Sequence, residues 1–215
     1  MIELLKKEKL IVILRGLKRE QMIPTARALR DSGVHFLEVT FVQNSKTCVE
    51  DTTWAISNAV ERFPDLYVGA GTVLSVLQAE AAYESGAKYI ISPNVDEAVI
   101  RRTVELGMVS IPGAFSPSEI VNAYNWGATF VKLFPAGDLG IAYVKAIRAP
   151  ISHIPLLAVG GVDLENMEAF YKAGICGFGI GGSIVRKDLI DRGDYTALTA
   201  LAKQYTDFTV ALGKE

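Results

Sequence analysis

The sequence TFVKLF at residues 129–134 is a short run of β-branched, aromatic and aliphatic residues that contains one lysine. Gly127 and Ala128 precede the run, and Pro135 follows it. A short apolar run that ends at a proline is typical of a buried β-strand. Lysine is almost never fully buried unless it is paired or used. We therefore predict a strand over residues 129–134 and treat Lys132 as a candidate functional residue.

Seven further runs of this kind occur outward from that strand, at residues 10–14, 35–40, 66–70, 88–92, 108–111, 156–159 and 177–180. Helical patterns separate them, at residues 20–30, 45–63, 75–85, 95–106, 116–127, 141–148 and 164–173, and a final one covers 195–212. Regular alternation of strands and helices predicts βαβ units and a parallel sheet. We predict an α/β fold of the (β/α)₈ TIM-barrel class, with residues 1–215 as a single domain. The alternative is an open doubly wound sheet, but Arg15-Gly16-Leu17 stands where that fold favours GxGxxG.

The composition excludes several classes of function. The formal net charge is -2, from 22 basic and 24 acidic residues, which argues against a nucleic-acid binder or a basic membrane-surface protein. No apolar segment approaches membrane-spanning length, and residues 1–9 do not resemble a signal peptide. Two isolated cysteines and two distant histidines give little support for a zinc site or a disulfide framework. We expect a soluble cytoplasmic protein with no nucleic-acid or membrane partner.

The candidate catalytic residues are Lys132 and Glu38. Desolvation would lower the pKa of the lysine, and a partly desolvated amine can form a Schiff base with a ketone. The alternative for Lys132 is a strand-end side chain that extends out to solvent. Glu38 lies in the apolar segment FLEVTF at residues 36–41, and burial would raise its pKa toward the range of a general acid or base. The alternative for Glu38 is a structural ion pair with Lys132 or Arg15.

The candidate binding residues follow other predicted strands, where the active site of a TIM barrel forms. Arg15 offers a planar set of donors for a carboxylate or phosphate, and the alternative is that it covers the barrel mouth. Thr72 follows the small residues of GAG at 69–71, which let a ligand approach closely or suit a tight turn. Gly160 and Gly161 follow the seventh strand, and Gly182 and Ser183 follow the eighth. Loops after those two strands often bind phosphate, so the sequence indicates a phosphorylated ligand.

Taken together, these segments resemble the 2-keto-3-deoxy-6-phosphogluconate (KDPG) / 4-hydroxy-2-oxoglutarate (KHG) aldolase family of class I aldolases. The matching segments are ILRG (13–16), LEVT (37–40), VGAGTV (68–73), ISPN (91–94), IPG (111–113), VKLFPA (131–136), VGGV (159–162) and IGGS (180–183). They cover nearly the whole chain in order.

The resemblance implies a (β/α)₈ barrel, usually trimeric, without a metal or organic cofactor. It implies Lys132 as the Schiff-base lysine and Glu38 as the general acid/base. Arg15 and Thr72 would hold the 2-keto acid, Pro93 would join the substrate-binding set, and the phosphate would bind to Gly160, Gly161, Gly182 and Ser183. The implied reaction cleaves a 2-keto-3-deoxy-6-phospho sugar acid to pyruvate and glyceraldehyde 3-phosphate, with 4-hydroxy-2-oxoglutarate, which gives pyruvate and glyoxylate, as a further substrate.

Two positions depart from the family pattern. Many phosphogluconate aldolases have arginine where this chain has Val42, and threonine where it has Val159. The branch that acts on 2-keto-3-deoxy-6-phosphogalactonate (KDPGal) resembles this chain in ILRG and in an apolar residue before Gly-Gly, so the preferred C4 epimer stays open. Two other functions also stay open: another phosphate-binding barrel enzyme, such as a sugar-phosphate isomerase or synthase, and a non-catalytic binder of a phosphorylated sugar acid.

Overall fold

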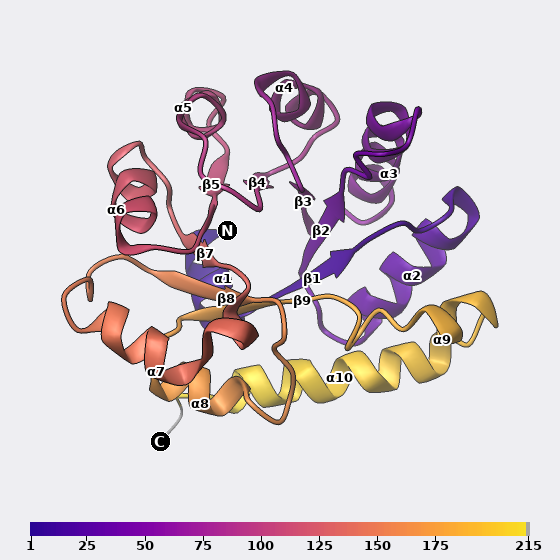
Figure 1. Cartoon of the computed structure of the whole chain (residues 1–215). Helices are drawn as coiled ribbons and strands as arrows, with labels where there is room; N and C mark the ends of the chain where they lie inside the picture. The colour runs from indigo at the N-terminus through magenta and orange to yellow at the C-terminus, as the bar shows by residue number, and fades with distance from the viewer. Residues whose placement is uncertain (214–215) are drawn as a thin grey trace.

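A computed structural model describes residues 1–213 and contains a barrel of parallel strands inside a ring of helices (Figure 1). The strands are β1 (Leu10–Leu14), β2 (Phe36–Thr40), β3 (Tyr67–Gly71), β4 (Tyr89–Ile91), β5 (Val109–Ile111), β6 (Gly113–Ala114), β7 (Val131–Leu133), β8 (Leu156–Val159) and β9 (Gly177–Ile180). They pair in the order β5-β4-β3-β2-β1-β9-β8-β7-β6. The predicted TIM-barrel class is confirmed.

Strand β5 corresponds to the fifth predicted strand at residues 108–111, and β6 continues it beyond the predicted end, after an interruption at Pro112. Proline has no backbone N–H, so it cannot donate in the sheet. Its carbonyl still accepts from the Lys132 N–H at 2.9 Å, and the Ser110 carbonyl accepts from Thr129 at 2.9 Å. Because β5 pairs with β4 and β6 pairs with β7, this segment closes the barrel. The count of nine strands rather than eight therefore reflects one broken strand.

The helices are α1 (Ile2–Glu8), α2 (Arg19–Asp31), α3 (Cys48–Arg62), α4 (Val76–Glu84), α5 (Glu97–Glu105), α6 (Pro117–Asn125), α7 (Ala136–Arg148), α8 (Met167–Lys172), α9 (Lys187–Asp191) and α10 (Tyr195–Ala211). The short helices α1 and α9 were not expected from the sequence. Helix α7 begins five residues before the predicted start at 141, because the chain is already helical before a kink at Gly140, where φ is +75°. Within residues 1–213, no helix has the length and apolar character needed to cross a membrane.

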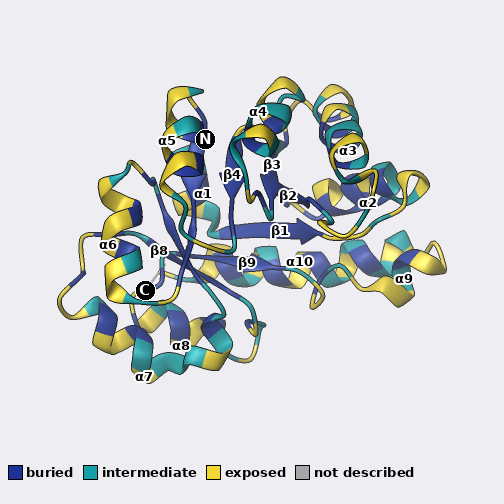
Figure 2. Ribbon diagram, turned by 45° about the horizontal axis from the view of Figure 1, so that its top comes forward, coloured by how far each residue is buried: buried dark blue, intermediate teal, exposed yellow. Residues whose placement is uncertain are grey.

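The strands are mostly buried, and the helices around them mix buried and exposed residues (Figure 2). The buried residues form two main clusters, one between the strands and the helices and one inside the barrel. Alternate residues of β1, such as Val12 and Leu14, pack outward against the helices. The inward set is a separate apolar cluster that contains Ile11, Phe36 and Tyr89, with Leu5 of α1 packed against it. Helix α1 leads directly into β1, so this cluster fills the N-terminal end of the barrel. The C-terminal end is therefore left for polar residues.

Candidate active site

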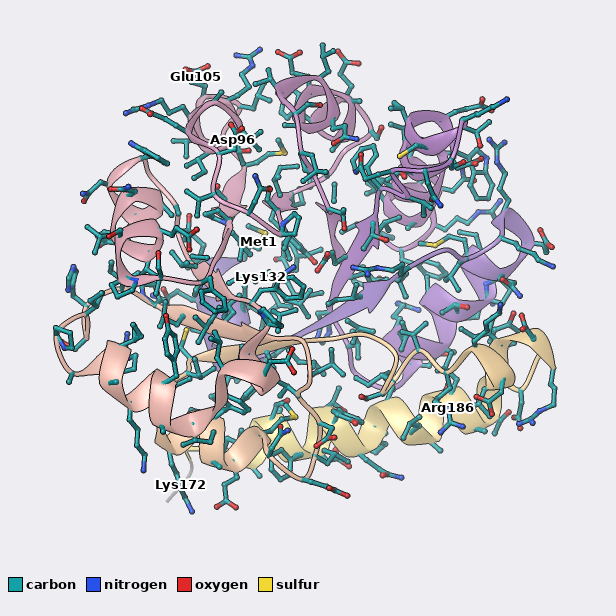
Figure 3. The ribbon with its side chains drawn as sticks, in the orientation of Figure 1. Met1, Asp96, Glu105, Lys132, Lys172 and Arg186 are labelled. Atoms are coloured by element: carbon teal, nitrogen blue, oxygen red, sulfur yellow. The ribbon has the colours of Figure 1, made fainter. Side chains whose placement is uncertain are left out.

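Lys132 is the middle residue of β7 and lies near the centre of the barrel in Figure 3. It is only 5% exposed. Its neighbours Val131 and Leu133 belong to the core between strands and helices, so the pleat directs Lys132 into the barrel. The Lys132 Nζ atom lies 4.6 Å from the centroid of the Phe134 ring, within cation–π range. The alternative of a lysine that extends into solvent is wrong, because the side chain is buried.

Glu38 occupies the corresponding inward position on β2 and is 2% exposed. Attraction to the Lys132 ammonium and to the Arg15 guanidinium favours the Glu38 carboxylate, yet burial outweighs it and raises the pKa of Glu38. Burial likewise lowers the pKa of Lys132, against the opposing effect of Glu38. Both pKa shifts favour the neutral forms of the two groups. The pKa values of Glu38 and Lys132 therefore lie closer to neutral pH than those of exposed side chains, which suits proton transfer.

In the part of the chain that the structure describes, no ion pair of 4.0 Å or less joins Glu38 to Lys132 or Arg15. Glu38 therefore does not form the direct ion pair that was the alternative to a catalytic role. The amine and the carboxylate act on each other through their charges while the Lys132 amine stays clear of a direct carboxylate contact.

The glycines of β3 serve the interior of the barrel. A Cβ atom at Gly71 would lie 1.8 Å from Glu38 Oε1, and one at Gly69 would lie 2.2 Å from the Tyr89 ring. Glycine is needed at both positions because neighbouring side chains fill the space. The sequence left two interpretations of these glycines open, the close approach of a ligand and a tight turn, whereas in the structure Gly71 makes room for the Glu38 carboxylate.

A cavity of about 480 Å³ opens beside Lys132 at the C-terminal ends of the strands. It is lined by six of the predicted residues: Arg15, Lys132, Gly160, Gly161, Gly182 and Ser183. The sequence reasoning assigned no role to Phe134 and Asp163, which also line it. Phe134 could have been found, because a residue two positions after Lys132 on a strand faces the same way.

Thr72 and Pro93 follow β3 and β4, and neither lines that cavity. Thr72 has φ of +56°, which is unusual for a β-branched residue. Its carbonyl accepts a hydrogen bond of 2.7 Å from Gln43 Nε2, and the Gln43 Oε1 atom accepts from Gln78. Strain of this kind persists where the surroundings enforce it, and it is concentrated at functional sites.

The glycine loop after β8 closes against the start of α7. The Gly137 N–H donates to the Gly160 carbonyl at 2.7 Å. Gly160 and Gly161 have φ of +85° and +70°, and a Cβ at Gly161 would lie 3.0 Å from Gly137 Cα. On the neighbouring loop, the Ser183 side chain forms a hydrogen bond with Tyr205 of α10. Burial raises the pKa of Tyr205, and this hydrogen bond acts in the opposite direction. Each of the two predicted phosphate loops thus makes a hydrogen bond with a neighbouring helix, the first with Gly137 of α7 and the second with Tyr205 of α10.

No cluster of three or more His, Cys, Asp or Glu side chains suited to a metal ion occurs within residues 1–213. The groups that meet at the cavity are one buried amine, one arginine and two glycine loops. Such a set suits covalent chemistry on a ketone together with binding of an anion.

Comparison with known proteins identifies the family. The KDPG and KHG aldolase model matches residues 1–201. A probable 2-dehydro-3-deoxy-6-phosphogalactonate aldolase from Rhizobium meliloti (strain 1021) is 39% identical over 82% of each chain. A 2-dehydro-3-deoxy-phosphogluconate aldolase from Treponema pallidum (strain Nichols) is 35% identical over 94% of each chain.

Solved structures agree with the sequence relatives. A native KDPGal structure has a TM-score of 0.82 and 32% identity, and covers 94% of this chain and 96% of its own. The KDPG aldolase from Legionella pneumophila, with pyruvate captured as a covalent carbinolamine, has a TM-score of 0.83 and 27% identity, and covers 93% of this chain and 95% of its own. The match of the family model along most of the chain, together with these relatives, shows that the chain belongs to the KDPG and KHG aldolase family.

Proposed function

We propose that this protein is a class I aldolase in which Lys132 forms the Schiff base and Glu38 transfers the protons. The family makes the chain a carbon–carbon lyase for 2-keto-3-deoxy phosphosugar acids. The observation that supports these residue roles best is the buried Lys132 amine, whose pKa is lowered by burial beside an open cavity.

The reaction starts when the neutral amine of Lys132 attacks C2 of the 2-keto acid. Loss of water from the carbinolamine gives an iminium ion, which accepts the electron pair of the C3–C4 bond. Glu38, acting through a water molecule, removes the proton of the C4 hydroxyl as that bond breaks. Glyceraldehyde 3-phosphate leaves, and Glu38 helps to protonate C3 of the remaining enamine. Hydrolysis of the resulting iminium then frees pyruvate and Lys132.

The two ends of the substrate bind to different parts of the barrel mouth. Arg15 acts on both Lys132 and Glu38 through its charge, which supports a role in holding the carboxylate next to the reacting carbon. Thr72 and Pro93 bind the same carboxylate end of the substrate. The phosphate binds to the loops that contain Gly160 and Gly161 and, opposite them, Gly182 and Ser183.

The preferred substrate is the phosphogalactonate epimer. Val159 lines the cavity directly before the glycine pair, and it has no hydroxyl to offer to the substrate. A site that hydrogen-bonds the C4 hydroxyl in one orientation disfavours the epimer whose hydroxyl points the other way, so an apolar residue here changes which C4 epimer is satisfied. The 39%-identical relative is named for this substrate.

The whole chain acts as one domain, and it works in the cytoplasm as a homotrimer. The free thiols of Cys48 and Cys176 support a reducing compartment. The exposed apolar side chains of Leu74, Leu77 and Phe115 lie at the same end of the barrel, and Leu77 is 77% exposed, which supports burial between copies. Light scattering after size exclusion should give three times the 23.3 kDa chain mass, whereas a monomer mass would reject the trimer.

Reduction with borohydride in the presence of pyruvate tests the chemistry. We expect a pyruvate-derived adduct by intact mass, and peptide mapping should assign it to Lys132. An adduct on another lysine, such as Lys145 of α7, would overturn the proposed role of Lys132. Absence of any adduct would favour another phosphate-binding barrel enzyme or a non-catalytic binder.

A further inference from the structure

We propose that Asn166 is a positioning residue for the phosphorylated end of the substrate, because it fixes the peptide planes of the loop after β8. The proposal rests on the proposed function, in which this loop holds the phosphate. Asn166 immediately precedes α8 and does not line the cavity among the described residues. Its effect would be transmitted through the backbone of Gly161 and Asp163.

The Asn166 side chain bridges two backbone groups of this loop. Its Nδ2 atom donates to the Gly161 carbonyl at 3.0 Å, and its Oδ1 atom accepts from the Asp163 N–H at 3.1 Å. Gly161 and Asp163 both line the cavity. One amide side chain therefore fixes the backbone on both sides of Val162.

The held carbonyls determine where the amides point. In a trans peptide the N–H points away from the preceding carbonyl. Gly137 holds the Gly160 carbonyl and Asn166 holds the Gly161 carbonyl, so the N–H groups of Gly161 and Val162 are turned away from these two partners. Within residues 1–213 neither N–H donates to another protein group. Two adjacent unused amides at a cavity wall suit an anion.

Glycine makes this loop dependent on such a hold. Gly160 and Gly161 can adopt many backbone conformations in addition to the observed φ of +85° and +70°. Each alternative would turn one of the amide groups elsewhere. The bond from Asn166 thus selects one arrangement before the ligand arrives, which lowers the entropic cost of binding.

Helix capping does not explain the side chain. Asparagine at the residue before a helix usually accepts a hydrogen bond from an N–H in the first turn. Asn166 occupies that position in α8 but makes no side-chain cap bond. Its amide instead bonds to Gly161 and Asp163 in the loop after β8, which favours a role in the phosphate site over a role in starting the helix.

The test compares two aldehydes in the condensation with pyruvate, namely D-glyceraldehyde 3-phosphate and unphosphorylated D-glyceraldehyde. For Asn166→Ala we expect KM for the phosphorylated aldehyde to rise about tenfold, the effect of losing one or two hydrogen bonds. KM for D-glyceraldehyde and the rate of pyruvate trapping on Lys132 should stay within about twofold of wild type, because neither involves the phosphate loop. Inorganic phosphate should inhibit the variant about tenfold more weakly.

Two further variants separate positioning from stability. Asn166→Ser keeps a good helix-starting residue, but its hydroxyl is too short to bridge the Gly161 carbonyl and the Asp163 N–H. It should keep the wild-type Tm and still lose affinity for the phosphorylated aldehyde. Glu165→Ala is the matched control in the same loop, since the Glu165 side chain forms none of these bonds, and its kinetics should be unchanged.

The outcomes distinguish the two proposals. An equal rise in KM for both aldehydes, or no rise for either, would reject the role of Asn166 even when wild type forms its pyruvate adduct. If wild type forms no adduct on Lys132, the proposed function itself fails. If adducts form but wild type binds the two aldehydes equally, the phosphate loop is wrongly assigned.

Discussion

Gly71→Ala is the sharpest perturbation of the catalytic geometry. The added Cβ would lie 1.8 Å from Oε1, 2.5 Å from Cδ and 2.6 Å from Cγ of Glu38. Carbon atoms pack at about 3.5–4.0 Å, so the carboxylate must move by roughly 1 Å or more. Overpacking of a core costs about 1–3 kcal/mol of stability. A displacement of about 1 Å at a reacting group can lower the rate about 100-fold.

We therefore expect Gly71→Ala to lower kcat for cleavage about 100-fold while pyruvate is still trapped on Lys132. Steady-state release of pyruvate measures the first quantity, and borohydride trapping measures the second. Gly107→Ala is a matched control at the opposite end of the barrel, where a Cβ meets nothing within 4 Å but φ is +73°. It should lose about 1 kcal/mol of stability from backbone strain and keep its kcat. A Gly71→Ala enzyme with kcat near that of wild type would refute the assignment of Glu38 as the base.

The remaining predictions concern the site itself. Lys132→Ala should abolish turnover and trapping, and Glu38→Gln should keep trapping but lose most of the cleavage rate. If Glu38→Gln cleaved at near wild-type rate, another group would have to be the base. Because burial lowers the pKa of Lys132, imine trapping should increase with pH and level off below the ordinary lysine pKa of about 10.4; an increase that continues to that pH would contradict the shift. Because burial raises the pKa of Glu38, kcat should fall with decreasing pH at a value above the ordinary pKa of about 4.3. Val159→Thr should shift the ratio of kcat/KM for the two C4 epimers about tenfold toward phosphogluconate, and an unchanged ratio would remove Val159 from the specificity argument.

The fold was largely predictable because its signals are local. Apolar runs that end at proline or glycine gave the strands, and Ser116 before Pro117 gave the start of α6, where the Ser116 side chain accepts from the Glu119 N–H. The errors occurred where local signals conflict. The sequence predicts that a strand ends before Pro112, but the sheet continues beyond this proline in β6. It also predicts that a helix starts at residue 141, because Gly140 interrupts the helical pattern after the first turn of α7. The extent of the domain and the roles of the site residues stay predictions.

The sequence by itself determined the α/β barrel and singled out Lys132 and Glu38, because a charged residue in an apolar strand is visible without coordinates. Tertiary structure decided what those charges do to each other. Desolvation depends on every neighbour that excludes water, so only the folded barrel could show that burial outweighs the attraction between the two groups. It also decided that Gly71 makes room for a carboxylate and that Asn166 holds a loop five residues earlier in the chain. Such roles arise from contacts across space, which spacing along the chain does not encode.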